Sequence, residues 1–377
     1  MVVWSTIPSC LVAGLLMLMA WTIPAYADVV ESMQGRFFGR IVFGEKSVRV
    51  QDRTVAWNDL VFVLRQEASP SVAAPQTLYM SSGEIWHVNL QRLTGKKLKV
   101  ISPLLGERDV DLASVRMVDL VPDAGGRAGN TPGTLYREGA EPVPCTLMWI
   151  NADRVSADST LGILTLPREG SLRYVNVAAP TTLPAGHDDD EVGLIDGSTF
   201  RGRATLGADR IELQHATVGK LTIPAAAVRS LVRSTPAVTF ITGFARGQMQ
   251  TIGVTGPSAL PALAAAEPAG CLHQITLQPR TIVRYPLSQP GATLRLAQQS
   301  VAGTRGDALI RVRAGEKVLL EQKVTPADGP GVATLDLGAA KELTIEVDFA
   351  SAPRFPCGVA WLDPVLIRKQ EPMFRSR

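Results

Sequence analysis

The chain has 377 residues, of which 46% are apolar and 6% aromatic, and its net charge is +3 at pH 7. This is the composition of an ordinary globular protein, long enough for two or three domains. Basic and acidic residues are interspersed, so the composition implies no polyanion-binding surface, and the scarcity of aromatic side chains argues against base stacking; we therefore expect no nucleic-acid partner.

The first 27 residues have the pattern of an export signal. An apolar run from Cys10 to Trp21 precedes Ala25-Tyr26-Ala27, a small–x–small triplet that suits cleavage after Ala27. The run is short for a bilayer span of ~20 residues. An uncleaved anchor is the alternative, because no Lys or Arg precedes the run. No later segment is apolar for long enough to span a membrane, so we expect an exported protein, periplasmic or extracellular.

A coarse internal repeat follows the leader. Three segments combine an apolar pair, a turn and a glycine: LYMSSG ending at Gly83, LYREG ending at Gly139 and LIDG ending at Gly197. A shorter first copy occupies residues 35–63. Each copy continues in short runs of alternating apolar and polar residues between Gly and Asp turns, which is typical of half-buried antiparallel strands.

The fourth copy shows the alternation most clearly, with Ile211 and Leu213 separated by polar residues. Four copies of a five-strand meander predict small barrels or stacked sheets. The pattern of Gly197 and Gly202 resembles Sm-like barrels, in which a glycine lets a strongly bent strand pass. We expect a structural or protein-contacting platform rather than an RNA-binding one.

Linkers rich in turn-forming residues divide the chain. They predict a leader at 1–27, copies one and two at 28–121, copy three at 134–180, copy four at 191–234 and a last domain at 236–369.

The last domain has the pattern of a β-sandwich. Strand-like runs alternate with Gly and Pro clusters, and LTIEVDF places Leu343, Ile345, Val347 and Phe349 on one face and its polar residues on the other. At ~1.5–3 kcal/mol for each buried apolar side chain, such strands supply a core for about 100 residues. The whole chain is therefore predicted to be all-β, with tandem small repeats before a sandwich.

Four stretches of this domain, taken in order, resemble the NPCBM family of carbohydrate-binding modules, of the glycosyl hydrolase family 98 type. They are GCLHQITLQPRTIVRYPL, GDALIRVRAGEKVLLEQ, GVATLDLGAAKELTIEVDF and GVAWLDPVLIRK. The resemblance covers residues 236–369. It implies a jelly-roll-like sandwich related to galactose-binding-like domains, with a glycan or an envelope polysaccharide as its ligand.

The resemblance also implies the residues of a sugar site. Trp361 and Tyr285 would stack on the ligand, and His273 and Asp363 would make hydrogen bonds to it. Three of these residues have a simpler structural interpretation as well: Trp361 in the core, His273 hydrogen-bonded within the sandwich, and Asp363 at the end of a strand.

Three cysteines follow the leader: Cys145, Cys271 and Cys357. None has C-x-x-C spacing, and Cys271 with His273 lacks a third ligand, so we expect no metal site. Export permits disulfides, and Cys271 and Cys357 fall in the same predicted domain, so we expect a bridge between them. Cys145 is then expected to be a buried thiol.

The sequence shows no catalytic motif. It has no H-E-x-x-H, G-x-S-x-G, Walker or G-x-G-x-x-G pattern, and its four histidines are scattered. The run HDDDE at 187–191 is typical of a solvated linker. We expect a non-catalytic protein without a cofactor.

Two alternatives remain open. One is an envelope scaffold that binds a protein partner and no glycan. The other is a glycoside hydrolase whose carboxylates meet only in the fold, drawn from Asp196, Asp209, Asp348 and Asp363.

Overall fold

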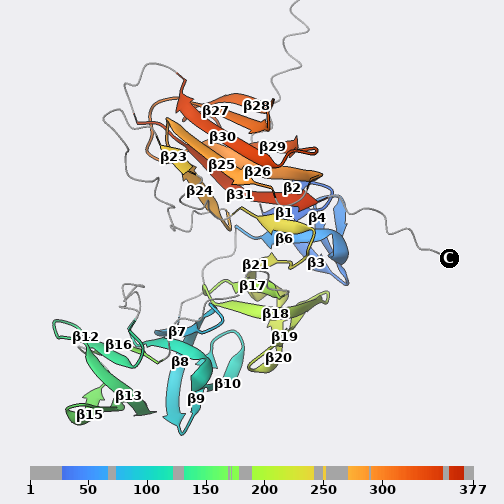
Figure 1. Ribbon diagram of the computed structural model, residues 1–377. Coiled ribbons are helices and arrows are strands. Elements are labelled where there is room, and N and C mark those ends of the chain that lie inside the picture. Colours follow the sequence, from blue (N-terminus) through green and yellow to red (C-terminus); the bar gives the residue numbers. More distant parts are fainter. Residues whose placement is uncertain are drawn as a thin grey trace, which may run out of the picture. The chain divides into compact units, whose positions relative to one another are not determined.

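A computed structural model describes residues 28–66, 74–121, 131–168, 170, 172–177, 189–241, 249–251, 271–287, 290–350 and 356–368. These residues form β-strands and short 3₁₀ turns without any α-helix, which confirms the all-β fold class (Figure 1). None of the described segments forms a helix with the length and hydropathy that a bilayer span requires. The predicted export signal lies outside the described residues.

The chain divides into two compact units. We call Tyr26–Val238 the repeat unit and Thr239–Arg377 the sandwich unit, and each has its own hydrophobic core.

The repeat unit contains four copies of one strand pattern. Copy 1 is β1 (Val29–Ser32), β2 (Arg36–Phe38), β3 (Ile41–Gly44), β4 (Ser47–Val50), β5 (Arg53–Ala56) and β6 (Leu60–Leu64). Copy 2 is β7 (Gln76–Met80), β8 (Ile85–Thr94), β9 (Lys97–Ser102), β10 (Gly106–Asp111) and β11 (Val115–Asp119). Copy 3 is β12 (Thr134–Arg137), β13 (Val143–Ile150), β14 (Arg154–Ser159), β15 (Gly162–Pro167) and β16 (Leu172–Asn176). Copy 4 is β17 (Asp190–Leu194), β18 (Thr199–Leu206), β19 (Arg210–His215), β20 (Gly219–Pro224) and β21 (Val228–Val232).

In every copy the last strand returns to pair with the first, antiparallel. In copies 1, 2 and 4 a 3₁₀ turn (Trp57–Asp59, Leu112–Ser114, Ala225–Ala227) leads into that last strand. The first copy begins earlier than its expected start at residue 35. Its opening strand β1 is buried at all four positions, so it has no alternation by which the sequence could reveal it.

The copies join in pairs through their last strands. β6 of copy 1 pairs with β21 of copy 4, where Val63 lies opposite Leu231. β11 of copy 2 pairs with β16 of copy 3, where Val118 lies opposite Val175. The results are an eight-stranded sheet (β2-β1-β6-β21-β17-β18-β19-β20) and a ten-stranded sheet (β10-β9-β8-β7-β11-β16-β12-β13-β14-β15).

Copies 2 and 4 also meet through a buried polar cluster around Glu84. Its carboxylate accepts hydrogen bonds from Ser82 Oγ (2.5 Å), the Arg201 main-chain N–H (2.5 Å) and His215 Nε2 (2.9 Å). His215 Nδ1 accepts from two main-chain N–H groups, those of Thr217 and Val218, so the ring proton is on Nε2 and points to Glu84.

The sandwich unit consists of β22 (Val238–Phe240), β23 (Met249–Thr251), β24 (Gln274–Leu277), β25 (Thr281–Pro286), β26 (Ala292–Ser300), β27 (Ala308–Ala314), β28 (Lys317–Val324), β29 (Gly331–Asp336), β30 (Glu342–Phe349) and β31 (Val359–Arg368). The first sandwich sheet has the order β22-β31-β26-β29, with β24 also paired to β31, and the second has the order β23-β25-β30-β27-β28. Leu294 and Trp361 from the first sheet share one core with Ile310 and Ile345 from the second.

Candidate ligand-binding site

The outward face of the second sandwich sheet carries the candidate site. Along β30, Leu343, Ile345 and Val347 are buried, as the alternation predicts, and the polar residues between them point away from the core. Strand pairing then places the side chains of β25 and β27 beside these polar residues.

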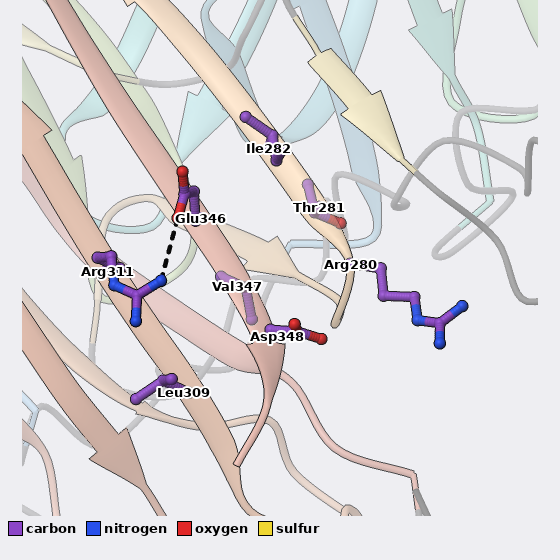
Figure 2. Close-up of a pocket in the computed structure, with 8 residues that line it drawn as sticks. All are labelled: Arg280, Thr281, Ile282, Leu309, Arg311, Glu346, Val347 and Asp348. Carbon is purple, nitrogen blue, oxygen red and sulfur yellow. Dashed lines mark hydrogen bonds and ion pairs between the residues drawn. The ribbon is translucent and has the colours of Figure 1, made fainter.

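The register forms two rows of residues across the sheet. In one row Glu346 lies between Ile282 of β25 and Arg311 of β27. In the next row Asp348 lies opposite Leu309, and Arg280, the residue immediately before β25, completes the set of six as a lining residue of the same cavity. With Thr281 and Val347 these six residues line a cavity of about 300 Å³ (Figure 2).

One end of the cavity is held by ion pairs. Arg311 Nε donates to Glu321 Oε2 at 2.6 Å, and Arg311 Nη1 lies 3.4 Å from Glu346 Oε2, while Arg313 lies 3.6 Å from the same oxygen. The hydrogen bond with Glu321 raises the pKa of Arg311 above its ordinary value, and the same bond lowers the pKa of Glu321. These contacts fix the direction of the Arg311 guanidinium and the Glu346 carboxylate.

At the other end of the cavity, two charged side chains form no such ion pairs with any described residue. Arg280 and Asp348 are both exposed, and neither has an ion-pair partner among the described residues. Asp348 accepts one hydrogen bond, from the main chain of Phe349 at 2.8 Å. Thr281 Oγ1 is buried at the cavity wall, with no hydrogen-bond partner in the described part of the chain.

The backbone at Arg280 is unusual. Its φ is +61°, in the left-handed region that non-glycine residues enter at a cost of ~1–2 kcal/mol. Such strain concentrates at functional sites, where it directs a side chain that the surrounding structure needs. Arg280 and Asp348 both line the cavity, and Figure 2 shows the Arg280 side chain extending outward from the end of β25.

The four site residues expected from the sequence do not form this cavity. Trp361 is 0% exposed and belongs to the sandwich core, so the prediction that it stacks on a sugar is corrected: its ring has no face for a ligand. Tyr285, on β25 in the other sheet, is half-buried and packs against the same core.

Asp363 and His273 do come together, but through the main chain. Asp363 Oδ1 accepts from the N–H groups of Leu272 and His273, both at 2.7 Å, and its own N–H donates to the His273 carbonyl at 2.8 Å. Asp363 is 2% exposed and has a φ of +47° within β31, at an irregularity of the ladder rather than at a strand end. The Asp363 carboxylate therefore holds the main chain of Leu272 and His273, immediately before β24. The His273 ring is half-buried and packs edge-on against Phe240, with ring centroids 5.2 Å apart.

The structure contains no disulfide bond between Cys271 and Cys357, so the predicted bridge is not formed, and Cys357 is a free thiol. Both side chains are buried, and burial, with the charges of Asp307 and Asp348, raises the pKa of the Cys357 thiol. Cys145 is only half-buried, where a buried thiol was expected; desolvation raises its pKa too.

Of the carboxylates considered for catalysis, only Asp348 lines the cavity. Asp196 is buried and accepts from the Ser198 N–H at 2.9 Å, Asp209 is exposed in a turn beside Arg210, and Asp363 is used as described. No group of three or more His, Cys, Asp or Glu side chains in the described segments is arranged to hold a metal ion. His187 and Asp188 of the acidic run lie outside those segments.

Comparisons with known proteins give no family. No family model matches the chain, and no curated protein does. Among solved structures, one of CBM51-2 in complex with GlcNAc and INT domains, from ZmpB of Clostridium perfringens, is 11% identical over 70% of this chain and 44% of its own, with a TM-score of 0.24. Another, of the M60 catalytic domain with CBM51-1 and CBM51-2 of the same protein, is 9% identical over 88% and 37%, with a TM-score of 0.26.

A third structure, the insecticidal delta-endotoxin Cry8Ea1 of Bacillus thuringiensis, is 12% identical over 62% of this chain and 51% of its own, with a TM-score of 0.21. The chain thus spans less than half the length of the two carbohydrate-binding-module structures. TM-scores this low establish neither a family nor a function.

Proposed function

We propose that the protein is an exported, non-catalytic glycan-binding protein, whose sandwich unit holds a sugar in the cavity of its second sheet. The repeat unit serves as the platform that carries this module. The observation that supports the proposal best is a cavity with an apolar wall whose lining includes two exposed charged side chains, Arg280 and Asp348, that have no ion-pair partner among the described residues.

The chemistry of the cavity suits a polyhydroxylated ligand. Each sugar hydroxyl both donates and accepts, so a carboxylate acceptor beside a guanidinium donor can bind two neighbouring hydroxyls. Ile282 and Leu309, at opposite corners of the two rows, offer apolar contact for the C–H faces of a ring. A volume of about 300 Å³ is at the lower end for ligand pockets, which favours one sugar residue or a chain end.

A glycan array probed with the full chain tests this proposal. We expect binding to a restricted set of glycans, and Arg280→Gln should lower the signal at least tenfold because it removes the guanidinium of the rim. Lys341→Gln is the matched control, since Lys341 is an exposed cation of the same unit outside the cavity. An array on which the wild-type chain binds nothing above background would remove the proposal.

One observation favours a second candidate, a glycoside hydrolase. Glu346 and Asp348 both line the cavity from one face of β30, and alternate residues of a strand lie ~6.6–6.8 Å apart. Side chains that start from main-chain positions this far apart can hold two carboxyl groups at the ~6.5–9.5 Å of inverting glycosidases. Incubating each bound glycan with the chain and measuring new reducing ends distinguishes the two: binding without cleavage supports the first proposal, and turnover lost in Glu346→Gln supports the second.

A further inference from the structure

The ten-stranded sheet of the repeat unit ends in a strand with unusual chemistry. β15 is the terminal strand on the side of copy 3, so one of its edges carries main-chain N–H and C=O groups that no neighbouring strand pairs within the sheet. Such an edge is a template for another strand, and proteins usually protect it with charged side chains.

In copies 2 and 4 the corresponding strand carries charged side chains. β20 of copy 4 reads GKLTIP, with Lys220 paired to Glu212 at 2.9 Å, and β10 of copy 2 reads GERDVD. β15 reads GILTLP and has no charge at all. Ile163 stands where copy 4 has Lys220, and its side chain is 67% exposed.

A second apolar side chain lies at the same end of β15. Leu161, just before the strand, is 77% exposed, whereas its counterpart Leu105 of copy 2 is 8% exposed and Val218 of copy 4 packs against the core. Copy 3 therefore presents an uncharged edge strand with two apolar side chains in water.

We propose that this edge is a dimerisation surface, at which β15 pairs antiparallel with β15 of a second copy of this chain. Antiparallel pairing of a strand with itself is self-complementary and closes on a two-fold axis, so it makes a dimer rather than a fibre. An uncharged strand meets itself without the like-charge repulsion that would arise if β10 or β20 did the same.

The chain already uses this mode of association internally. Its copies join through antiparallel pairing of two corresponding strands, β6 with β21 and β11 with β16, around apolar pairs. In a dimer centred on Leu164, Ile163 of each chain lies opposite Thr165 of the other, and β-branched side chains form favourable pairs across strands. The edge of β15 is thus best suited to pair with β15 of a second copy of this chain.

Sedimentation velocity of the full chain over a range of concentrations tests this inference. We expect a reversible monomer–dimer equilibrium whose dissociation constant rises at least tenfold in Ile163→Lys, the substitution that restores the residue type of copy 4. Met148→Lys, which changes a 42% exposed side chain on the interior strand β13, is the control and should leave the equilibrium unchanged.

A wild-type chain that stays monomeric at every concentration would overturn the inference. So would a dimer that Ile163→Lys leaves as tight as before. Circular dichroism and the unfolding midpoint of each variant show whether it is folded, and since Ile163 is exposed we expect both to match the wild type.

Discussion

At the scale of single residues, Glu84 of the repeat unit is a buried carboxylate whose hydrogen bonds connect two copies. Its side chain is 2% exposed, and it accepts hydrogen bonds from three donors, two of which belong to copy 4. A buried carboxylate is costly unless every lone pair is used, so this cluster both satisfies Glu84 and fixes how copies 2 and 4 meet.

Glu84→Ala should therefore destabilise the repeat unit strongly. It leaves the His215 ring N–H, the Ser82 hydroxyl and a main-chain N–H without their acceptor, and each buried donor left unsatisfied costs about 1–3 kcal/mol. Urea unfolding followed by circular dichroism measures the loss. Glu212→Ala removes an exposed partner of Lys220 and should leave the midpoint unchanged. Equal midpoints for the two variants would contradict the account of Glu84.

The residues of the sandwich show why a family resemblance can place a domain better than it places a site. Trp361 sits in a strand whose residues are almost all buried, and its conspicuous side chain belongs to the core. The residues that line the cavity are ordinary polar and aliphatic side chains on or beside three neighbouring strands, β25, β30 and β27. The alternation in LTIEVDF predicts which residues of β30 face outward. It does not predict which residues of β25 and β27 lie beside them, because that depends on the pairing register, nor the left-handed backbone of Arg280.

At the scale of elements, period-two alternation predicted the strands that have one buried face, such as β19, β20 and β30. It could not predict β1, which is buried at all four positions, because its sequence VVES has two apolar residues followed by two polar ones and therefore no period-two alternation. The turn glycines of the repeats were also predictable: Gly83, Gly139 and Gly197 all have φ between +67° and +88°.

Gly202 of β18 is needed for a different reason: its φ is not left-handed, but there is no room for a side chain at this position. A Cβ at this position would collide with the main-chain carbonyl of Gln214 on the neighbouring strand β19. Because that obstacle is backbone, it cannot turn aside as a flexible side chain could.

Gly202→Ala should destabilise the repeat unit by about 1–3 kcal/mol, the usual cost of overpacking. The comparison is Gly329→Ala, where a new Cβ meets nothing within 4 Å and φ is not left-handed. That variant should be neutral or slightly more stable, since alanine restricts the unfolded chain. Thermal unfolding of both variants checks the prediction, and a Gly202→Ala chain as stable as wild type would show that β18 and β19 can separate without cost.

At the scale of the whole molecule, the order of the copies in the sequence is not their order in the sheets. Copy 1 pairs with copy 4, and copy 2 with copy 3, so the repeat unit is built from nested pairs. The sequence shows the repeats but not this nesting, because β11, β16 and β21 have similar patterns (VRMVD, LRYVN and VRSLV) and the apolar β6 (LVFVL) could in principle join any of them.

The proposed glycan binding rests on the sandwich unit, where we propose that Asp348 and Arg280, which both line the cavity, bind the hydroxyls of a sugar. Asp348 is exposed and makes no ion pair within the described chain, so replacing it by Asn should remove ligand affinity without unfolding the sheet.

Titration calorimetry of the strongest array glycan into the full wild-type chain and into Asp348→Asn tests that claim most directly. The account predicts an affinity at least tenfold lower for Asp348→Asn, and an unchanged affinity for Glu316→Gln, an exposed carboxylate in the turn between β27 and β28. Equal affinities for the wild type and Asp348→Asn would contradict it, because the glycan would then be bound elsewhere.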